Sequence, residues 1–137
     1  MSRPQPAGST VRPPRAGQTD RCGTFVIDAR RVKRSRAAVL PHEVNADIAD
    51  TFQVLAHPTR VRIIQALAAG ELCVCELSEV LGLSVSATSH QLRLLRTRRL
   101  VRARADGKLM HYSLADPFVL ALLKDCTRHV QGKEARR

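Results

Sequence analysis

Apolar residues recur at helical spacing along most of the chain after residue 44. Asn45 can cap a first helix, which ends before Pro58. A second helix starts at or after Pro58 and stops at Gly70, because proline suits a first helical turn and glycine a helix end. The apolar positions of these two helices are Ile48, Ala49, Phe52, Val54, Leu55, Val61, Ile63, Ile64 and Leu67.

The next two segments have the form of a helix, a glycine turn and a second helix. Residues 73–81 predict a short helix that Gly82 ends, and Ser84 caps a longer one that runs to about Thr97. The inward stripe of the longer helix is Val85, Thr88, Leu92 and Leu95. Two helices joined in this way predict a motif that reads DNA.

Two runs rich in β-forming residues follow, over residues 100–105 and 108–114. Asp106-Gly107 separates them and is a strong hairpin signal. A last amphipathic helix is predicted over residues 116–131, and its wide apolar face indicates contact with a partner chain. The pattern predicts a mainly α fold with a small β-hairpin, that is, a winged helix-turn-helix that forms a homodimer through its terminal helices.

Composition narrows the class of partner. The chain has 137 residues, enough for one domain, and its net charge of +11 favours binding to phosphates. Aromatic residues make up 3% with no Trp, so stacking on unpaired bases is a poor explanation and duplex DNA is the expected partner. No apolar run approaches the roughly 18 residues of a membrane span, and we expect a cytoplasmic protein with no membrane partner.

The basic charge is concentrated at the N-terminus. Residues 1–36 hold nine Lys or Arg against two acidic residues, which fits either a solvated tail or an arm that touches DNA. A basic helix is predicted over residues 29–39, before Pro41. The expected organisation is a disordered basic tail over residues 1–19, an arm with Cys22 over residues 20–43, the winged helix-turn-helix over residues 44–131 and a basic tail over residues 132–137.

The polar face of the predicted recognition helix carries the expected DNA contacts. At 100° per residue, Ser86, His90 and Arg93 project opposite the apolar stripe. Ser86 and His90 suit base edges or phosphate, and Arg93 suits phosphate or guanine. The expected DNA-binding residues are Ser84, Ser86, Ser89, His90, Gln91, Arg93, Arg104 and Lys108. The alternative is a solvated polar face with Ser84 as a plain helix cap.

Cys73 and Cys75 stand one residue apart, directly ahead of the predicted helix-turn-helix. Thiolates select soft cations such as Cd(II), Pb(II), Zn(II) and trivalent arsenic. Residues two apart on a regular helix point about 200° from each other. The pair can therefore hold one ion only from a non-helical end or by unwinding a turn, and binding would distort the helix that supports the reading helix. The alternative is a pair of small buried residues.

Three stretches resemble the ArsR/SmtB family of metal-sensing repressors: ELCVCEL at 71–77, SHQLR at 89–93 and GKLMHYSL at 107–114. This resemblance, which spans about residues 21–131, implies a homodimeric winged helix that leaves its operator when metal binds. The stretch RCGTF at 21–25, running on to Asp28 and Val32, resembles the arm of the CadC branch. In that branch, arm thiols of one subunit reach the Cys-Val-Cys of the other.

The CadC-like resemblance implies a metal site built from Cys22 of one chain with Cys73 and Cys75 of the other. Val26 stands where that branch has a second arm cysteine, so three sulfurs are expected rather than four. Three sulfurs would suit lead, bismuth or arsenic, and cadmium with an added ligand. The expected inducer is Cd(II) or Pb(II), with As(III) and Zn(II) as alternatives.

The family also has a zinc-type site on its last helix. Asp116 and His129 match two of its positions, but Phe118 stands where a His is expected and Gly132 where an acid is expected. We therefore expect this site to be lost. Cys126 is expected to be a packed residue of the dimer helix. It is therefore, like Asp116 and His129, a less favoured metal ligand than Cys22, Cys73 and Cys75.

The sequence thus predicts a non-enzymatic, dimeric repressor that Cd(II) or Pb(II) releases from operator DNA. One alternative is a repressor of the same fold that responds to arsenite or antimonite. A further alternative is a thiol redox regulator or enzyme. Against it, no catalytic base is spaced near either cysteine of the pair and no glycine-rich cofactor loop occurs.

Overall fold

The computed structural model of the chain describes residues 26–134 and residue 136. The chain divides into two units, residues 1–40 and residues 41–137. The expected tail over residues 1–19 and Cys22 of the expected arm lie outside the described residues.

In the first unit, the basic helix predicted over residues 29–39 is confirmed as α1 (Ala29–Ala38). Asp28 caps it, because one carboxylate oxygen accepts the amide N–H groups of Arg30 and Arg31 at 2.9 and 3.3 Å. None of its residues is buried. The cap and the backbone therefore define this helix without help from a core.

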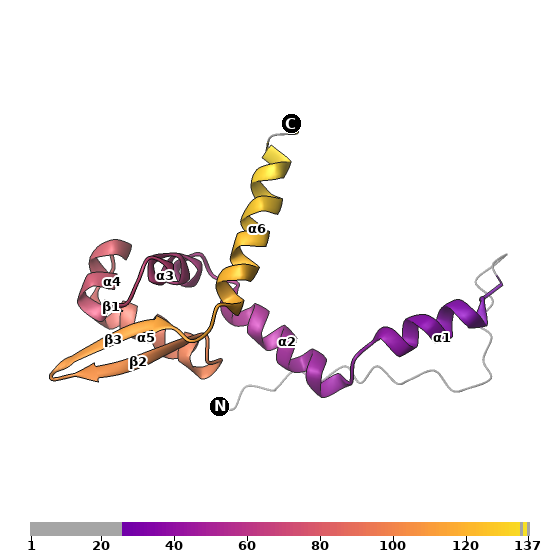
Figure 1. The fold of residues 1–137 in the computed structure, drawn as a ribbon, viewed down its shortest axis with the longest axis horizontal. Coiled ribbons are helices and arrows are strands. Elements are labelled where there is room, and N and C mark those ends of the chain that lie inside the picture. Colours follow the sequence, from indigo (N-terminus) through magenta and orange to yellow (C-terminus); the bar gives the residue numbers. More distant parts are fainter. Residues whose placement is uncertain (1–25, 135, 137) are drawn as a thin grey trace, which may run out of the picture. The chain divides into compact units, whose positions relative to one another are not determined.

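The second unit holds five helices and one small sheet (Figure 1). The helices are α2 (His42–Leu55), α3 (Pro58–Ala68), α4 (Val74–Leu81), α5 (Val85–Thr97) and α6 (Phe118–Glu134). The antiparallel sheet has the order β1-β3-β2, from β1 (Leu72–Cys73), β2 (Val101–Asp106) and β3 (Leu109–Leu114). The predicted mainly α fold with a β-hairpin is confirmed, with one strand more than predicted.

The extra strand, β1, changes the surroundings of the thiol pair. It places Leu72 opposite Tyr112 and Cys73 opposite His111 on β3. The hairpin turn is shifted by one residue from the prediction, because β2 runs to Asp106, which pairs with Leu109, and β3 begins one residue later than expected. The two-residue turn is therefore Gly107-Lys108, and Gly107 adopts a φ of 60° that glycine tolerates without strain.

The core lies between α3, α4, α5 and the base of the sheet. Its fully buried side chains are Ile63, Ile64, Leu77, Thr88, Leu92, Leu95 and Val119. Thr88 is tolerated there because its hydroxyl donates to the Ser84 carbonyl at 2.9 Å. Val85, predicted in the same inward stripe, is 46% exposed because the first turn of α5 lies outside this cluster. That part of the prediction is wrong.

Several helix boundaries differ from the prediction by a few residues. Helix α2 begins at His42 directly after Pro41, so Asn45 lies within the first turn and its N–H donates to the Pro41 carbonyl. Helix α4 begins at Val74 because Cys73 belongs to β1. Helix α6 spans Phe118–Glu134, so the first three residues of the predicted basic tail are helical. No helix of residues 26–134 is long and apolar enough to cross a membrane.

Candidate metal and DNA-binding sites

Cys73 stands at the junction between β1 and α4. Its backbone is extended, with φ of −79° and ψ of 166°, and it is the N-cap of α4. Cys75 is the second residue of that helix and is exposed, whereas Cys73 is 8% exposed. Of the two arrangements that let a Cys-x-Cys pair share an ion, the structure has the non-helical end.

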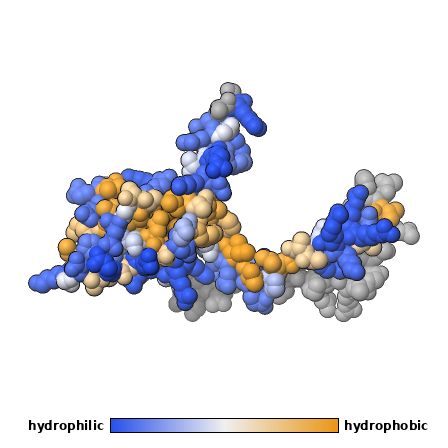
Figure 2. All heavy atoms as spheres, in the orientation of Figure 1, coloured by the Kyte–Doolittle hydropathy of each residue, from blue (hydrophilic) through white to orange (hydrophobic). Residues whose placement is uncertain are grey.

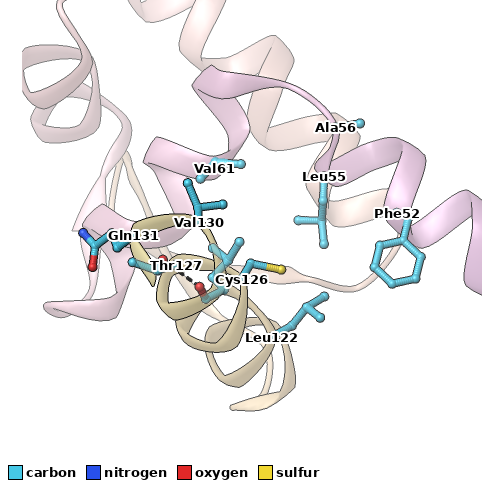
Figure 3. Close-up of a pocket in the computed structure, with 10 residues that line it drawn as sticks. Phe52, Leu55, Ala56, Val61, Leu122, Cys126, Thr127, Val130 and Gln131 are labelled. Carbon is cyan, nitrogen blue, oxygen red and sulfur yellow. Dashed lines mark hydrogen bonds between the residues drawn. The ribbon is translucent and has the colours of Figure 1, made fainter. Parts of the chain in front are cut away.

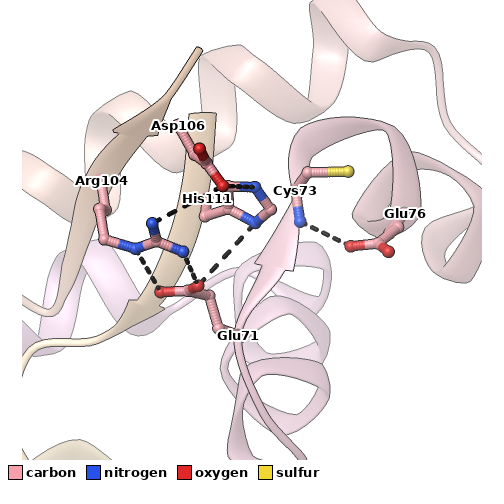
Figure 4. Close-up of polar contacts among 6 residues, drawn as sticks. All are labelled: Glu71, Cys73, Glu76, Arg104, Asp106 and His111. Carbon is pink, nitrogen blue, oxygen red and sulfur yellow. Dashed lines mark hydrogen bonds and ion pairs between the residues drawn. The ribbon is translucent and has the colours of Figure 1, made fainter. Parts of the chain in front are cut away.

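Glu76 and Cys73 form a capping box, which stabilises the junction between β1 and α4. The Glu76 carboxylate accepts the Cys73 backbone N–H at 2.8 Å (Figure 4). This bond, with a second one to the Cys73 side chain, lowers the pKa of Glu76 below its ordinary value of 4.5. The spacing of three residues between cap and acid is readable in the sequence, but with cysteine in the place of serine or threonine it was missed.

An ionic cluster joins the segment before Cys73 to the hairpin. Glu71, just before β1, accepts from two guanidinium nitrogens of Arg104 on β2, at 2.5 and 3.4 Å. His111 on β3 lies between two acids, 3.9 Å from Glu71 and 4.0 Å from Asp106 (Figure 4). Hydrogen bonding to Arg104 lowers the pKa of Glu71, and that of Arg104 is raised in turn. The cluster therefore connects all three strands next to the thiol pair.

Within residues 26–134, no three His, Cys, Asp or Glu side chains are grouped so that they could hold a metal ion. The described part of one chain thus offers Cys73 and Cys75 as a pair of soft donors. A site with three ligands would need one from outside the described residues of this chain. Cys22, the expected third ligand, is outside the described residues.

The recognition helix α5 is fixed at its middle and at its end. The Gln91 amide oxygen accepts from the Arg60 guanidinium on α3 at 2.8 Å. Arg98, which caps the C-terminus of α5, forms an ion pair with Asp50 on α2 at 2.6 Å. Since both contacts are partly buried, α5 is held in place by α2 and α3.

The expected DNA contacts fall into two groups. Ser86, His90, Arg93 and Lys108 are exposed, and the first three lie on α5 as the helical wheel predicted. Ser89 is half-buried beside them. The other three have partners within the chain: Ser84 caps Ala87, Gln91 binds Arg60 and Arg104 binds Glu71. The first group has exposed side chains, and the second group makes contacts within the chain, although Ser84 and Arg104 are exposed as well.

Asp116 and His129, which match two positions of the second metal site that we expect to be lost, lie toward opposite ends of α6. Asp116 accepts the Phe118 backbone N–H at 2.8 Å, so it caps the start of α6. His129 lies in the last third of that helix, about 17 Å from its start at Phe118 at 1.5 Å per residue. It borders a shallow hollow with Arg128, Lys133 and Arg136, where cations rather than acids surround it.

An apolar groove of about 580 Å³ runs between α2, α3 and α6 (Figure 3). Cys126 lines it together with Phe52, Leu55, Leu122 and Val130. Phe52 is 54% exposed and Val130 57%. Figure 2 shows the hydrophobic surface continuing along α2, where Val44 and Ile48 are also exposed. Patches of this kind mark interaction surfaces.

Comparison with known proteins identifies the class. Residues 57–103, from α3 into β2, match the bacterial regulatory protein arsR family. The chain is 39% identical over 113 residues to the transcriptional repressor SmtB homolog of Synechocystis sp., covering 82% of this chain and 86% of that protein. The chain belongs to the ArsR family. Members of this ArsR/SmtB family are transcriptional regulators, a non-enzymatic class, and the winged helix-turn-helix is their fold.

Two further relatives of this ArsR-family chain are named for the element they respond to or confer resistance to. The cadmium resistance transcriptional regulatory protein CadC homolog of Staphylococcus aureus is 35% identical over 111 residues, which cover 80% of this chain and 91% of that protein. The crystal structure of the AntR antimony-specific transcriptional repressor is 35% identical, with a TM-score of 0.65, over 71% of this chain and 88% of that one. The chain is thus similar both to a cadmium resistance regulator and to an antimony-specific repressor.

Proposed function

We propose that this protein is a dimeric transcriptional repressor that binds operator DNA and releases it when Cd(II) or Pb(II) binds its cysteine thiolates. The observation that carries the proposal is the position of Cys73. It is at once the cap of α4, the helix before the recognition helix, and a member of β1, which pairs with a strand of the wing. A ligand that moved this residue would act on both DNA-binding elements.

The thiol pair suits a soft ion. Cys73 and Cys75 supply two sulfur donors, and sulfur selects cadmium, lead, zinc and arsenic(III) over hard cations. The extended backbone at Cys73 allows both side chains to approach one ion without unwinding α4. Cys22 of the partner subunit is the third ligand in this proposal, as the CadC-like resemblance implies.

In this proposal, the partner subunit that carries Cys22 is a second copy of the chain in a dimer. The groove that α2 and α6 border is apolar, and both helices expose large side chains along it. A second copy of the chain would bury Phe52, Phe118 and Val130 and so remove them from water. In the dimer, Cys126 is an interface residue rather than a ligand.

The contacts of Cys73 would couple metal binding to DNA binding. The residue is buried and engaged with Glu76, so drawing its sulfur toward an ion breaks the capping box. The same movement strains the pairing of β1 with His111 and the adjoining bond between Glu71 and Arg104. Helix α4 and the wing then shift relative to α5, whose position α2 and α3 fix.

The DNA contacts in this proposal are Ser86, His90 and Arg93 in the major groove, with Lys108 of the wing on the backbone. Ser89 flanks them. Ser84, Gln91 and Arg104 act indirectly by holding α5 and the wing.

The test is the affinity of the protein for a duplex of its own promoter, measured by fluorescence anisotropy with and without cadmium. Wild-type affinity should fall by roughly 5- to 150-fold, the usual range of allosteric coupling. The double variant Cys73→Ser, Cys75→Ser should keep its affinity, and Cys126→Ser serves as the matched control that still responds. An unchanged wild type with both cadmium and lead, or a double variant that responds like wild type, would contradict the proposal.

Similarity to the antimony-specific repressor favours arsenite or antimonite as a second candidate inducer. The discriminating change is Cys22→Ser. If cadmium and lead use the arm, this variant loses their response. A full arsenite response that survives Cys22→Ser, in a protein that ignores cadmium and lead, would favour the second candidate. Release by peroxide but by no metal would instead favour a redox regulator.

A further inference from the structure

Helix α1 carries an unusual concentration of charge for its length. Its ten residues include five cations and no acid: Arg30, Arg31, Lys33, Arg34 and Arg36. Among the described residues, only Arg31 of these has an acidic partner, Asp28 at 3.5 Å, and that pair is exposed. The remaining four cations face water.

The cations are arranged as a face. At 100° per residue, Lys33, Arg30 and Arg34 fall within an arc of about 100°, and only Ala37 lies between them. Alanine is too short to cover its neighbours, so the three charged groups stay accessible. Val32 is on the opposite side and is 38% exposed.

The same spacing makes the isolated helix electrostatically unfavourable. Arg30 and Arg34 are four residues apart, and Arg30 and Lys33 are three apart, so like charges are neighbours on the helix surface. A ten-residue helix is marginal in water, and α1 buries no residue that would offset this repulsion. A polyanion along this face would remove the repulsion and stabilise the helix.

We propose that α1 is a second DNA-binding element, which contacts duplex phosphates without reading base sequence. Four of its five cations are arginines, whose planar guanidinium groups match phosphate oxygens in pairs. A membrane surface fits less well, because an interfacial helix needs a broad apolar face and α1 offers Val32 alone opposite the cationic arc. The choice of DNA over another polyanion rests on the operator binding proposed above.

The test uses the full-length protein and a duplex of unrelated sequence, without metal. The variant Arg30→Gln, Lys33→Gln, Arg34→Gln removes the cationic face and keeps residues that favour helix. The matched control Lys124→Gln, Arg128→Gln, Lys133→Gln removes the same charge from exposed positions of α6. The measured quantity is the slope of the logarithm of the binding constant against the logarithm of salt concentration.

Each lost phosphate contact lowers the magnitude of this slope by about 0.9. If all three cations contact phosphate, we expect the magnitude of the slope to fall by about 2.7 per chain in the α1 variant. The slope of the control should stay near that of wild type. Hydrogen exchange at the amides of α1 should also slow when the duplex is added to wild type. Equal slopes for the α1 variant and the control would overturn the proposal.

Two comparisons separate this inference from the function proposed above. The α1 variant should keep the preference for promoter DNA over unrelated DNA, whereas His90→Ala, Arg93→Ala should lose that preference and keep the contribution of α1 to the slope. Binding to phosphatidylserine vesicles that the α1 variant abolishes, together with an unchanged DNA slope, would assign α1 to a lipid surface and overturn the inference. Neither result depends on the response to cadmium.

Discussion

Cys73 lies directly opposite His111 in the antiparallel ladder between β1 and β3. The residue that is expected to bind metal therefore shares backbone pairing with a strand of the wing. His111 in turn lies within 4.0 Å of Asp106, the last residue of β2 before the turn. In the proposed function, a displacement at the thiol pair would pass to the wing through these backbone contacts and the ionic cluster.

The pKa values of two carboxylates, Glu71 and Glu76, should respond differently when the ionic cluster is altered. Replacing Arg104 by Gln should raise the pKa of Glu71 toward 4.5, because the guanidinium bond is the main cause of its lowering. The pKa of Glu76 should stay low, since the Cys73 backbone N–H causes that shift. Carboxyl carbon chemical shifts followed by NMR through an acid titration measure both values.

The sign of the accompanying stability change follows from the direction of the shift. A lowered folded-state pKa means that the Glu71 carboxylate contributes stability above its unfolded-state pKa and loses it as pH falls through the folded value. The Arg104→Gln variant should therefore lose less stability than wild type when the pH drops below about 4.5. Parallel movement of the Glu71 and Glu76 values in the variant would show that the two carboxylates are not independent.

The core of α5 gives a prediction about stability. Leu92→Ala should lower the free energy of unfolding by about 2 to 5 kcal/mol, because it leaves a cavity beside fully buried neighbours. Val85→Ala, on the same predicted stripe, should cost less than about 1 kcal/mol, since Val85 is half exposed. Urea unfolding measures both, and similar losses for the two variants would mean that Val85 is buried in solution.

The apolar groove gives a prediction about assembly. Phe52→Glu should raise the dimer dissociation constant at least about tenfold, because it would bury an unpaired carboxylate in the interface. Val80→Glu is the matched control: Val80 is 55% exposed against 54% for Phe52, but it lies on α4, outside the groove. Sedimentation of both variants measures the dimer dissociation constant. A dimer that persists with Phe52→Glu but is lost with Val80→Glu would place the interface on α4.

The sequence predicted the helices and the wing because their signals are local. Pro58, Gly82 and Ser84 mark helix ends whatever lies around them, and the spacing of Thr88, Leu92 and Leu95 defines a buried stripe. Val85 has the same periodicity but lies in the first turn, where exposure depends on what packs nearby. Periodicity alone does not carry that information.

The surroundings of the thiol pair were less predictable because they are non-local. Strand β1 has two residues, and it exists only because β3 offers an edge beside it. The contact of Glu71 with Arg104 joins residues 33 positions apart, and that of Gln91 with Arg60 joins residues 31 apart. Such pairs have no signature in one sequence, so the partners of Gln91 and Arg104 within the chain were not predicted.

In the proposed function, thiolate binding of the metal and binding of the operator oppose each other, and linkage makes this opposition measurable from the metal side. The measurement is the cadmium affinity of the free protein and of the protein saturated with its promoter duplex, from the sulfur-to-cadmium charge-transfer absorption. We expect DNA to weaken cadmium binding by the same factor by which cadmium weakens DNA binding. Equal cadmium affinity in the two states would contradict it.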